Sequence, residues 1–191
     1  DVVAVPKIEK EALELLKRVR KSMGIYIFGE IPNKRSEDWD LKWFGGVALI
    51  QTVDDAAEQS FKDWIVVTKI KPTKKQIKLM QFGFKTVKAV RSNAVLVVDA
   101  KLSMTRGIGS GQTSRVGATK IAIEQAGKYC QGGVLVSDSF FPFDDSVQLA
   151  AKFKIGAILQ QGGSVNDQAS IDAANKFKIP MIFSGRRAFR H

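Results

Sequence analysis

Apolar and polar positions along the chain follow two different periods, and these distinguish expected strands from expected helices. Short apolar runs bounded by turn residues predict strands at 1–5, 24–28, 45–51, 64–68, 94–98, 134–136, 155–159 and 180–183. Apolar residues at three- and four-residue spacing predict helices that begin near residues 8, 73, 114, 145 and 165. Strands and helices therefore alternate, which is typical of an α/β layered fold with a mostly parallel sheet.

The helix after Pro72 has the clearest predicted boundaries. Thr73 followed by Gln76 forms the pattern of a capping box, and Ser92-Asn93 closes the segment. The run 94–98 is rich in β-branched residues, as in a strand that is covered on both faces. At this helix–strand junction, Asn93 is interpreted first as a helix C-cap, with a ligand contact as the alternative.

The stretch 132–145 is the one around which the chain is expected to be organised. A buried strand leads into Ser137-Asp138 and then into a loop with three phenylalanines and Pro142. Such an apolar loop predicts a binding wall, although a hydrophobic staple with buried phenylalanines explains it equally well. Asp144-Asp145 then begins a helix, whose N-terminal dipole favours carboxylates.

Two glycine-rich turns are further candidates for ligand binding. The segment 107–115 ends at Arg115 and precedes a helix, so its amides could hold a phosphate or carboxylate. It lacks the third glycine of a dinucleotide fingerprint and the Gly-Lys-Ser/Thr ending of a P-loop. In the second turn, 160–164, Ser164 and Asp167 are expected to cap a helix. Together with the loop after residue 137, both turns are expected at carboxyl ends of strands, forming a pocket for an anionic, planar heteroaromatic molecule.

Composition narrows the function classes. The net charge of +11 permits nucleic-acid binding, but the lysines are spread over helix faces without an aromatic-interleaved basic motif, which favours solvated surfaces. The chain has a single cysteine, Cys130, and a single histidine, His191. Neither an internal disulfide nor an ordinary zinc site is therefore expected. No apolar run suggests a membrane span or a signal peptide, so a cytoplasmic protein is expected. Asp1 in place of methionine suggests a processed or excised piece.

Two aromatic segments allow more than one interpretation. Trp39, Trp43 and Phe44 adjoin the charged loop 29–40 and are expected in a core or an interface, with a binding site as the alternative. The tail 184–191 is basic and aromatic, and residues alone leave a frayed end and a functional segment equally open.

Several of these motifs resemble the C-terminal part of the transformylase domain in the bifunctional family AICAR transformylase/IMP cyclohydrolase. The resemblance covers the chain, is densest from about Trp64, and rests on Ser92-Asn93-Ala94-Val95, the turn 107–115, Ser137-Asp138-Ser139-Phe140-Phe141-Pro142-Phe143, Gly162-Gly163-Ser164 and Phe189-Arg190-His191. It implies a cytidine-deaminase-like three-layer αβα fold without zinc. Residues 1–70 would end a first deaminase-like unit, and residues 71–191 would form a second.

The implied reaction transfers a formyl group from 10-formyltetrahydrofolate to the amine of AICAR in purine biosynthesis, and a separate N-terminal domain would close the product to IMP. The implied partners are AICAR, a reduced folate, the upstream part of the enzyme and a second copy of the chain. The resemblance places Asn93 by the formyl group, and it places Phe143 and Asp145 on the folate side. The residues implied for AICAR are Arg115, Phe140, Arg187, Phe189 and His191, with Arg187 pairing with the phosphate.

Some positions depart from the family pattern. Asp144 stands where the family often has Arg, Gln161 replaces a common Pro, and Arg106 alters the approach to the glycine turn. The family's catalytic Lys-His motif has no counterpart in these residues, so the chain alone is expected to be inactive. A non-catalytic ligand-binding paralogue and a basic nucleic-acid-binding domain are the alternatives.

Overall fold

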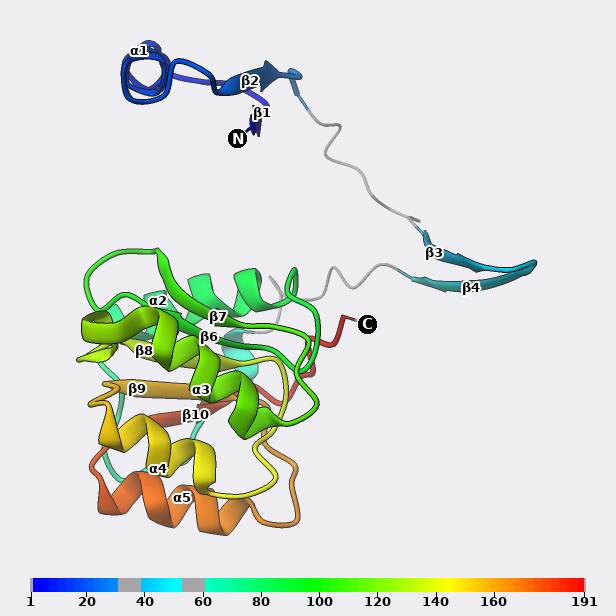
Figure 1. The fold of residues 1–191 in the computed structure, drawn as a ribbon. Coiled ribbons are helices and arrows are strands. Elements are labelled where there is room, and N and C mark those ends of the chain that lie inside the picture. Colours follow the sequence, from blue (N-terminus) through cyan, green and yellow to red (C-terminus); the bar gives the residue numbers. More distant parts are fainter. Residues whose placement is uncertain (1, 31–38, 53–60, 191) are drawn as a thin grey trace. The chain divides into compact units, whose positions relative to one another are not determined.

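The computed structural model describes residues 2–30, 39–52 and 61–190, which belong to two compact units, 1–54 and 55–191 (Figure 1). Within the described residues, no helix combines the length and the apolar character that crossing a membrane requires.

The first unit contains a strand–helix–strand segment and a hairpin. Its elements are β1 (Val2–Val5), α1 (Lys10–Val19), β2 (Gly24–Ile27), β3 (Trp39–Phe44) and β4 (Val47–Thr52). β1 and β2 pair in parallel, and β3 pairs with β4 antiparallel. Trp39, Trp43 and Phe44 all lie on β3 with exposed rings, so within this unit the core interpretation was wrong, while an interface or a binding site stays a prediction.

The second unit is built on one six-stranded sheet with the order β5-β10-β9-β8-β6-β7. Its strands are β5 (Ile65–Val66), β6 (Val95–Val98), β7 (Thr105–Gly109), β8 (Val134–Ser137), β9 (Ala157–Gln160) and β10 (Met181–Phe183). β8, β9 and β10 are parallel to one another, and β7 points the same way because both β7 and β8 are antiparallel to β6. The mostly parallel sheet is therefore confirmed in its strand directions, while β5 and β6 run the opposite way.

Helices cover both faces of this sheet (Figure 1). They are α2 (Lys74–Val87), α3 (Arg115–Ala126), α4 (Asp145–Lys152) and α5 (Asp167–Lys176), with short 3-10 turns at Phe61–Asp63 and Gly127–Cys130. Val95 and Val97 of β6 face a core with α3, α4 and α5, whereas Leu96 and Val98 face a second core with α2. The strand 94–98 is thus buried on both faces, as its sequence predicted, and the unit has three layers.

The first three residues of the predicted turn 107–115 belong to a strand. Gly107 and Gly109 belong to β7, where α3 packs directly on the backbone: a Cβ at these positions would lie 1.8 Å from the carbonyl oxygen of Ala122 and 1.9 Å from that of Ala118. The two glycines therefore admit a helix against the sheet, and the prediction that the segment 107–115 holds an anion stays a prediction for its remaining residues. The predicted helix start at Ser114 is confirmed, because its Oγ accepts a hydrogen bond from the N–H of Gly117 at 3.1 Å.

Candidate functional site

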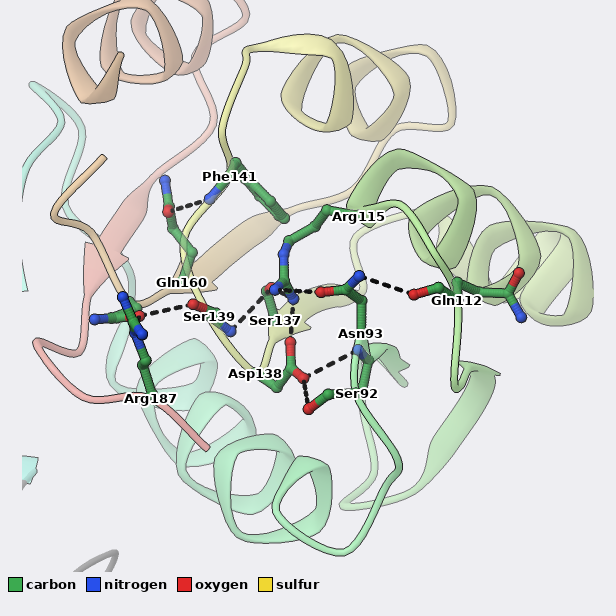
Figure 2. A network of polar contacts seen from close by, with 12 residues as sticks. Ser92, Asn93, Gln112, Arg115, Ser137, Asp138, Ser139, Phe141, Gln160 and Arg187 are labelled. Carbon is green, nitrogen blue, oxygen red and sulfur yellow. Dashed lines mark hydrogen bonds and ion pairs between the residues drawn. The ribbon is translucent and has the colours of Figure 1, made fainter. Parts of the chain in front are cut away.

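The ends of several strands meet at one edge of the six-stranded sheet. Val95 at the start of β6 pairs with Gly109 on one side and Ser137 on the other, so the residues beyond these three leave the sheet together. Because β9 is parallel to β8, Gln160 at the end of β9 lies at the same edge. Figure 2 shows the polar side chains that gather there.

Asp138, the first residue after β8, is the centre of this network. Its side chain is fully buried, and its Oδ2 accepts hydrogen bonds from the Oγ of Ser92 at 2.6 Å and the N–H of Ala94 at 3.1 Å. Its Oδ1 forms an ion pair with Arg115. A buried carboxylate is tolerated when its oxygens are occupied in this way. Asp138 and Ser92 were not expected as site residues, although an acidic residue directly after a buried apolar strand is a recognisable signal.

Arg115, the first residue of α3, extends into the same network. It is 8% exposed, its NH1 group donates to the Oγ of Ser137 at 3.2 Å, and its NH2 group donates to the Oδ1 of Asn93 at 2.8 Å. The Nδ2 of Asn93 donates to the carbonyl oxygen of Gln112 at 2.8 Å. α2 is capped at its carboxyl end by Lys88, so the interpretation of Asn93 as its C-cap was wrong. The Ser92–Asn93 peptide bond is cis.

The aromatic loop after β8 serves two purposes. Phe141 is fully buried in the core with α3, α4 and α5, and its N–H donates to the Oε1 of Gln160 at 2.9 Å. Phe140 is half-buried, and Phe143 is 60% exposed. The burial expected for the phenylalanines thus holds for Phe141, which anchors the loop. Phe140 and Phe143 remain available to form a wall, and its role in binding stays a prediction.

The carboxylates after this loop are placed at the beginning of α4. Asp144 is the N-cap residue without a side-chain cap bond, and its Oδ2 accepts from the Nε2 of Gln148 at 2.8 Å. The Oδ1 of Asp145 accepts from the N–H of Ser146 at 2.7 Å.

The predicted helix cap at Ser164 was wrong, because Asn166 is the N-cap of α5. The Oγ of Ser164 instead accepts a hydrogen bond from the N–H of Asn166 at 3.2 Å.

The tail is attached to the site through residue 190, and for this part the frayed-end interpretation was wrong. Ala188 donates its N–H to the carbonyl oxygen of Asp138 at 2.8 Å. The N–H of Arg190 donates to the Oγ of Ser92 at 3.1 Å, and the N–H of Ser92 donates to the carbonyl oxygen of Arg190 at 2.9 Å. His191 lies outside the described residues.

This attachment positions Arg187 and Phe189. The Arg187 guanidinium carbon lies 5.8 Å from the ring centroid of Phe140 and 5.4 Å from that of Phe189. Its Nε donates to the Oε1 of Gln161 at 3.3 Å, and the same oxygen accepts from the Oγ of Ser139 at 2.7 Å. Arg187 is exposed, so its charge faces solvent and the space beside the two rings.

A cavity of about 540 Å³ lies between these segments. Its lining residues are Asn93, Thr113, Ser114, Arg115, Val116, Ser139, Phe140, Pro142, Phe143, Asp145, Arg187 and Phe189. Thus every site residue expected from the sequence lines one cavity, apart from His191, which the structure does not describe. The cavity combines aromatic surface, amide and hydroxyl groups, two guanidinium groups and one carboxylate. Such a lining can bind a planar heteroaromatic ligand that carries an anionic group.

Comparison with known proteins identifies relatives across the chain. The family model described as AICARFT/IMPCHase bienzyme matches residues 1–125. The bifunctional purine biosynthesis protein PurH of Trichodesmium erythraeum is 44% identical over 194 residues, which cover 100% of this chain and 36% of that protein. PurH of Streptococcus agalactiae serotype III is 42% identical over 195 residues, covering 100% of this chain and 37% of that protein. A solved structure, Acinetobacter baumannii RibD form 1, aligns with 55% of this chain and 34% of its own at a TM-score of 0.43 and 12% identity.

Proposed function

Because the chain belongs to the AICARFT/IMPCHase bienzyme family, we propose that its second unit carries ligand-binding residues of the AICAR transformylase reaction. In this reaction a formyl group passes from 10-formyltetrahydrofolate to the amine of AICAR. The chain spans little more than a third of the PurH relatives, so the complete activity is proposed for the longer enzyme. The observation that carries the proposal is the convergence on one cavity of Asn93, which precedes β6, and of residues from α3, the loop after β8 and the tail.

The proposed AICAR end of the cavity lies between Phe140, Phe189 and Arg187. The two rings offer apolar faces to a flat aminoimidazole ring, and Arg187 can bind a phosphate by two parallel N–H bonds. The cavity volume of about 540 Å³ lies in the range of small-molecule sites. These features support an aromatic nucleotide better than an extended polymer.

Asn93 is proposed to contact the formyl group. An Asn amide has two N–H donors, and the structure uses one of them for the carbonyl oxygen of Gln112 at 2.8 Å. Arg115 bonds to the Oδ1 and so orients the amide, which leaves the second N–H as a donor toward a carbonyl oxygen in the cavity. A donor fixed in this manner stabilises charge that develops on such an oxygen.

The folate end is proposed at Phe143 and Asp145. Phe143 exposes most of its ring, and the half-buried Asp145 carries an acceptor beside it on the same wall. A carboxylate accepts hydrogen bonds from the amino and ring N–H groups of a reduced pterin. We further propose that the three-layer second unit is cytidine-deaminase-like. Because β5 joins its sheet and the compact unit begins at residue 55, such a unit would start before residue 71.

Calorimetric titration of the chain with AICAR and with a non-reactive folate analogue tests the proposal. Arg187→Ala is expected to lower the affinity for AICAR by roughly tenfold or more, the value of a charge-assisted contact, and to change the folate affinity little. Arg186→Ala is the matched control, because this neighbouring exposed arginine is directed toward Asp63 at 3.8 Å and does not line the cavity. Equal losses of affinity for AICAR and for the folate analogue in a folded Arg187→Ala protein would refute the assignment of Arg187 to the phosphate of AICAR.

A further inference from the structure

The two arginines that line the cavity are electrostatically different. Arg115 is buried and paired with Asp138, which is itself fully buried. Arg187 is exposed, and among residues 61–190 of the second unit no carboxylate is found within ion-pair distance of it; its Nε is bonded to the neutral amide of Gln161. Among residues 61–190, the charge of Arg115 is therefore compensated by a buried carboxylate, while Arg187 faces the cavity without a carboxylate within ion-pair distance.

The pairing of Asp138 with Arg115 is held by several independent contacts. The N–H of Asp138 donates to the carbonyl oxygen of Ala94 at 3.1 Å, and its own carbonyl oxygen accepts from Ala188 at 2.8 Å. Its Oδ2 is held by Ser92 and Ala94, so the Oδ1 remains directed at Arg115. Figure 2 shows the carboxylate of Asp138 between Ser92 and the guanidinium of Arg115. Leaving this position would break all of these hydrogen bonds and expose the carboxylate to an apolar interior, at a high cost in free energy.

We propose that Asp138 sets the polarity of the cavity. By cancelling the charge of Arg115, it leaves Arg187 as the cationic end, so that an anionic group is directed to Arg187 and a neutral group to Arg115 and Asn93. For AICAR this inference rests on the proposed function. It makes Asp138 a residue that positions the ligand and determines specificity without touching the ligand. For a simple anion such as inorganic phosphate, the inference depends only on the charges of Asp138, Arg115 and Arg187.

The charge of Arg115 is compensated at short range, because Asp138 forms a direct ion pair with it. A salt bridge between buried groups is screened little by solvent, so the Arg115–Asp138 pair acts on the cavity as a dipole and not as a net charge. Arg115 can still donate hydrogen bonds, and it does so to Asn93 and Ser137. Without Asp138, the same guanidinium would present a full positive charge to the cavity and compete with Arg187 for the anion.

The test measures binding of inorganic phosphate, AICAR and the unphosphorylated AICAR riboside to the full 191-residue chain. Asp138→Asn retains the shape of the side chain and removes its charge, so it is expected to bind phosphate roughly tenfold more tightly, the effect of one added charge-assisted contact. Ser92→Ala is the matched control, since it breaks the hydrogen bonds of the Ser92 Oγ with Asp138 and with Arg190 without changing any charge. Because it adds no positive charge to the cavity and loosens the tail that carries Arg187, it is expected to bind phosphate no more tightly than the unmodified chain. A gain in affinity separates this role from a merely structural one, because damage to the network would weaken binding.

A second variant tests the inference if Asp138→Asn does not fold. Arg115→Gln combined with Asp138→Asn removes both charges of the pair, and it is expected to retain the preference for AICAR over the riboside; Arg187→Gln is expected to lose that preference. Unchanged phosphate affinity in folded Asp138→Asn, or loss of the preference in the double variant, would overturn the inference. If AICAR and its riboside both fail to bind, but Asp138→Asn binds phosphate more tightly as expected, the proposed function is contradicted. The inference about the polarity of the cavity is then still supported.

Discussion

Gln161 and Arg187 are joined by a hydrogen bond from the Nε of Arg187 to the Oε1 of Gln161, 3.3 Å long. Ser139 donates to the same oxygen at 2.7 Å, so the loop after β8, the turn after β9 and the tail are connected at one atom. The resemblance to the transformylase family expects a proline at position 161, and proline has no side-chain acceptor. The glutamine therefore provides this chain with its own means of orienting Arg187.

Replacing Gln161 by alanine is expected to weaken AICAR binding by roughly threefold to tenfold, because Arg187 loses one of the contacts that restrict its side chain. The loss should be smaller than for Arg187→Ala, which removes the charge as well. Calorimetry on the three proteins measures it, with Gln168→Ala as control, since Gln168 bonds to Asp172 on the exposed surface of α5. A loss as large as that of Arg187→Ala would show that Gln161 does more than orient the arginine.

Phe143→Ala and Asp145→Asn are expected to act mainly on the folate side. The first removes apolar contact area and the second a charged acceptor, so each should cost on the order of 1–3 kcal/mol in binding of a folate analogue. AICAR affinity should change little. Phe153→Ala is the control, because this partly exposed phenylalanine at the end of α4 does not line the cavity. Unchanged affinity for the folate analogue in both variants would contradict the assignment.

The chain by itself is expected to show no measurable formyl transfer, even where it binds ligands. AICAR's amine is a weak nucleophile, and its proton must pass to a positioned base. Among the described residues that line the cavity there is neither a histidine nor a lysine. Tetrahydrofolate production can be followed spectrophotometrically with the chain alone and after addition of a separately made segment that carries the family's Lys-His motif. Activity only in the mixture is the expected result, and full activity of the chain alone would contradict it.

Much of the fold was predictable because local signals agreed with tertiary packing. The capping box at Thr73 and Gln76 is present in full, and the apolar run 94–98 is buried on both faces. The direction of β6 was not predictable, since an apolar run of four or five residues has the same pattern in either direction. β7 was missed because its two glycines suggested a turn, whereas they allow α3 to pack on the strand.

The candidate site was predictable from motifs only in part. Residues such as Phe140 and Arg187 were found through the resemblance, and the structure brings them to one cavity. Asp138 and Gln161 could not be predicted as site residues, because their contacts depend on which residues face them across strand ends and the tail. Contacts separated by more than twenty residues, such as Ser92 with Asp138, leave no periodic pattern in a single sequence.

Stability is expected to depend on Asp99 at acidic pH. The backbone N–H of Lys101, at 2.7 Å, and the guanidinium of Arg106, at 2.6 Å, hold the pKa of Asp99 below its ordinary value of 3.8. The folded state thus binds the proton less readily than the unfolded state, so the stabilisation is present above pH 3.8 and is lost as the pH falls through the lower folded value.

Urea unfolding between neutral and acidic pH measures this contribution. Asp99→Asn should be less stable at neutral pH and should lose less stability than the unmodified chain on acidification. Asp172→Asn removes a carboxylate from the exposed surface of α5 and serves as the comparison. Parallel stability curves for Asp99→Asn and the unmodified chain would contradict a role of Asp99 in the acid dependence.

The close packing of α3 on β7 makes Gly109 a sensitive position for both stability and binding. An alanine Cβ there would lie 1.9 Å from the carbonyl oxygen of Ala118, and this backbone atom can only be avoided by moving the helix. Gly109→Ala is therefore expected to cost about 1–3 kcal/mol of stability, measured by urea unfolding. In the first unit, Gly24→Ala is the control, since its Cβ would meet only side-chain atoms at 3.4 Å or more. Because α3 carries Arg115, the displaced helix should also misalign Asn93 and weaken AICAR binding; a variant that retains full stability would mean that α3 can shift without cost.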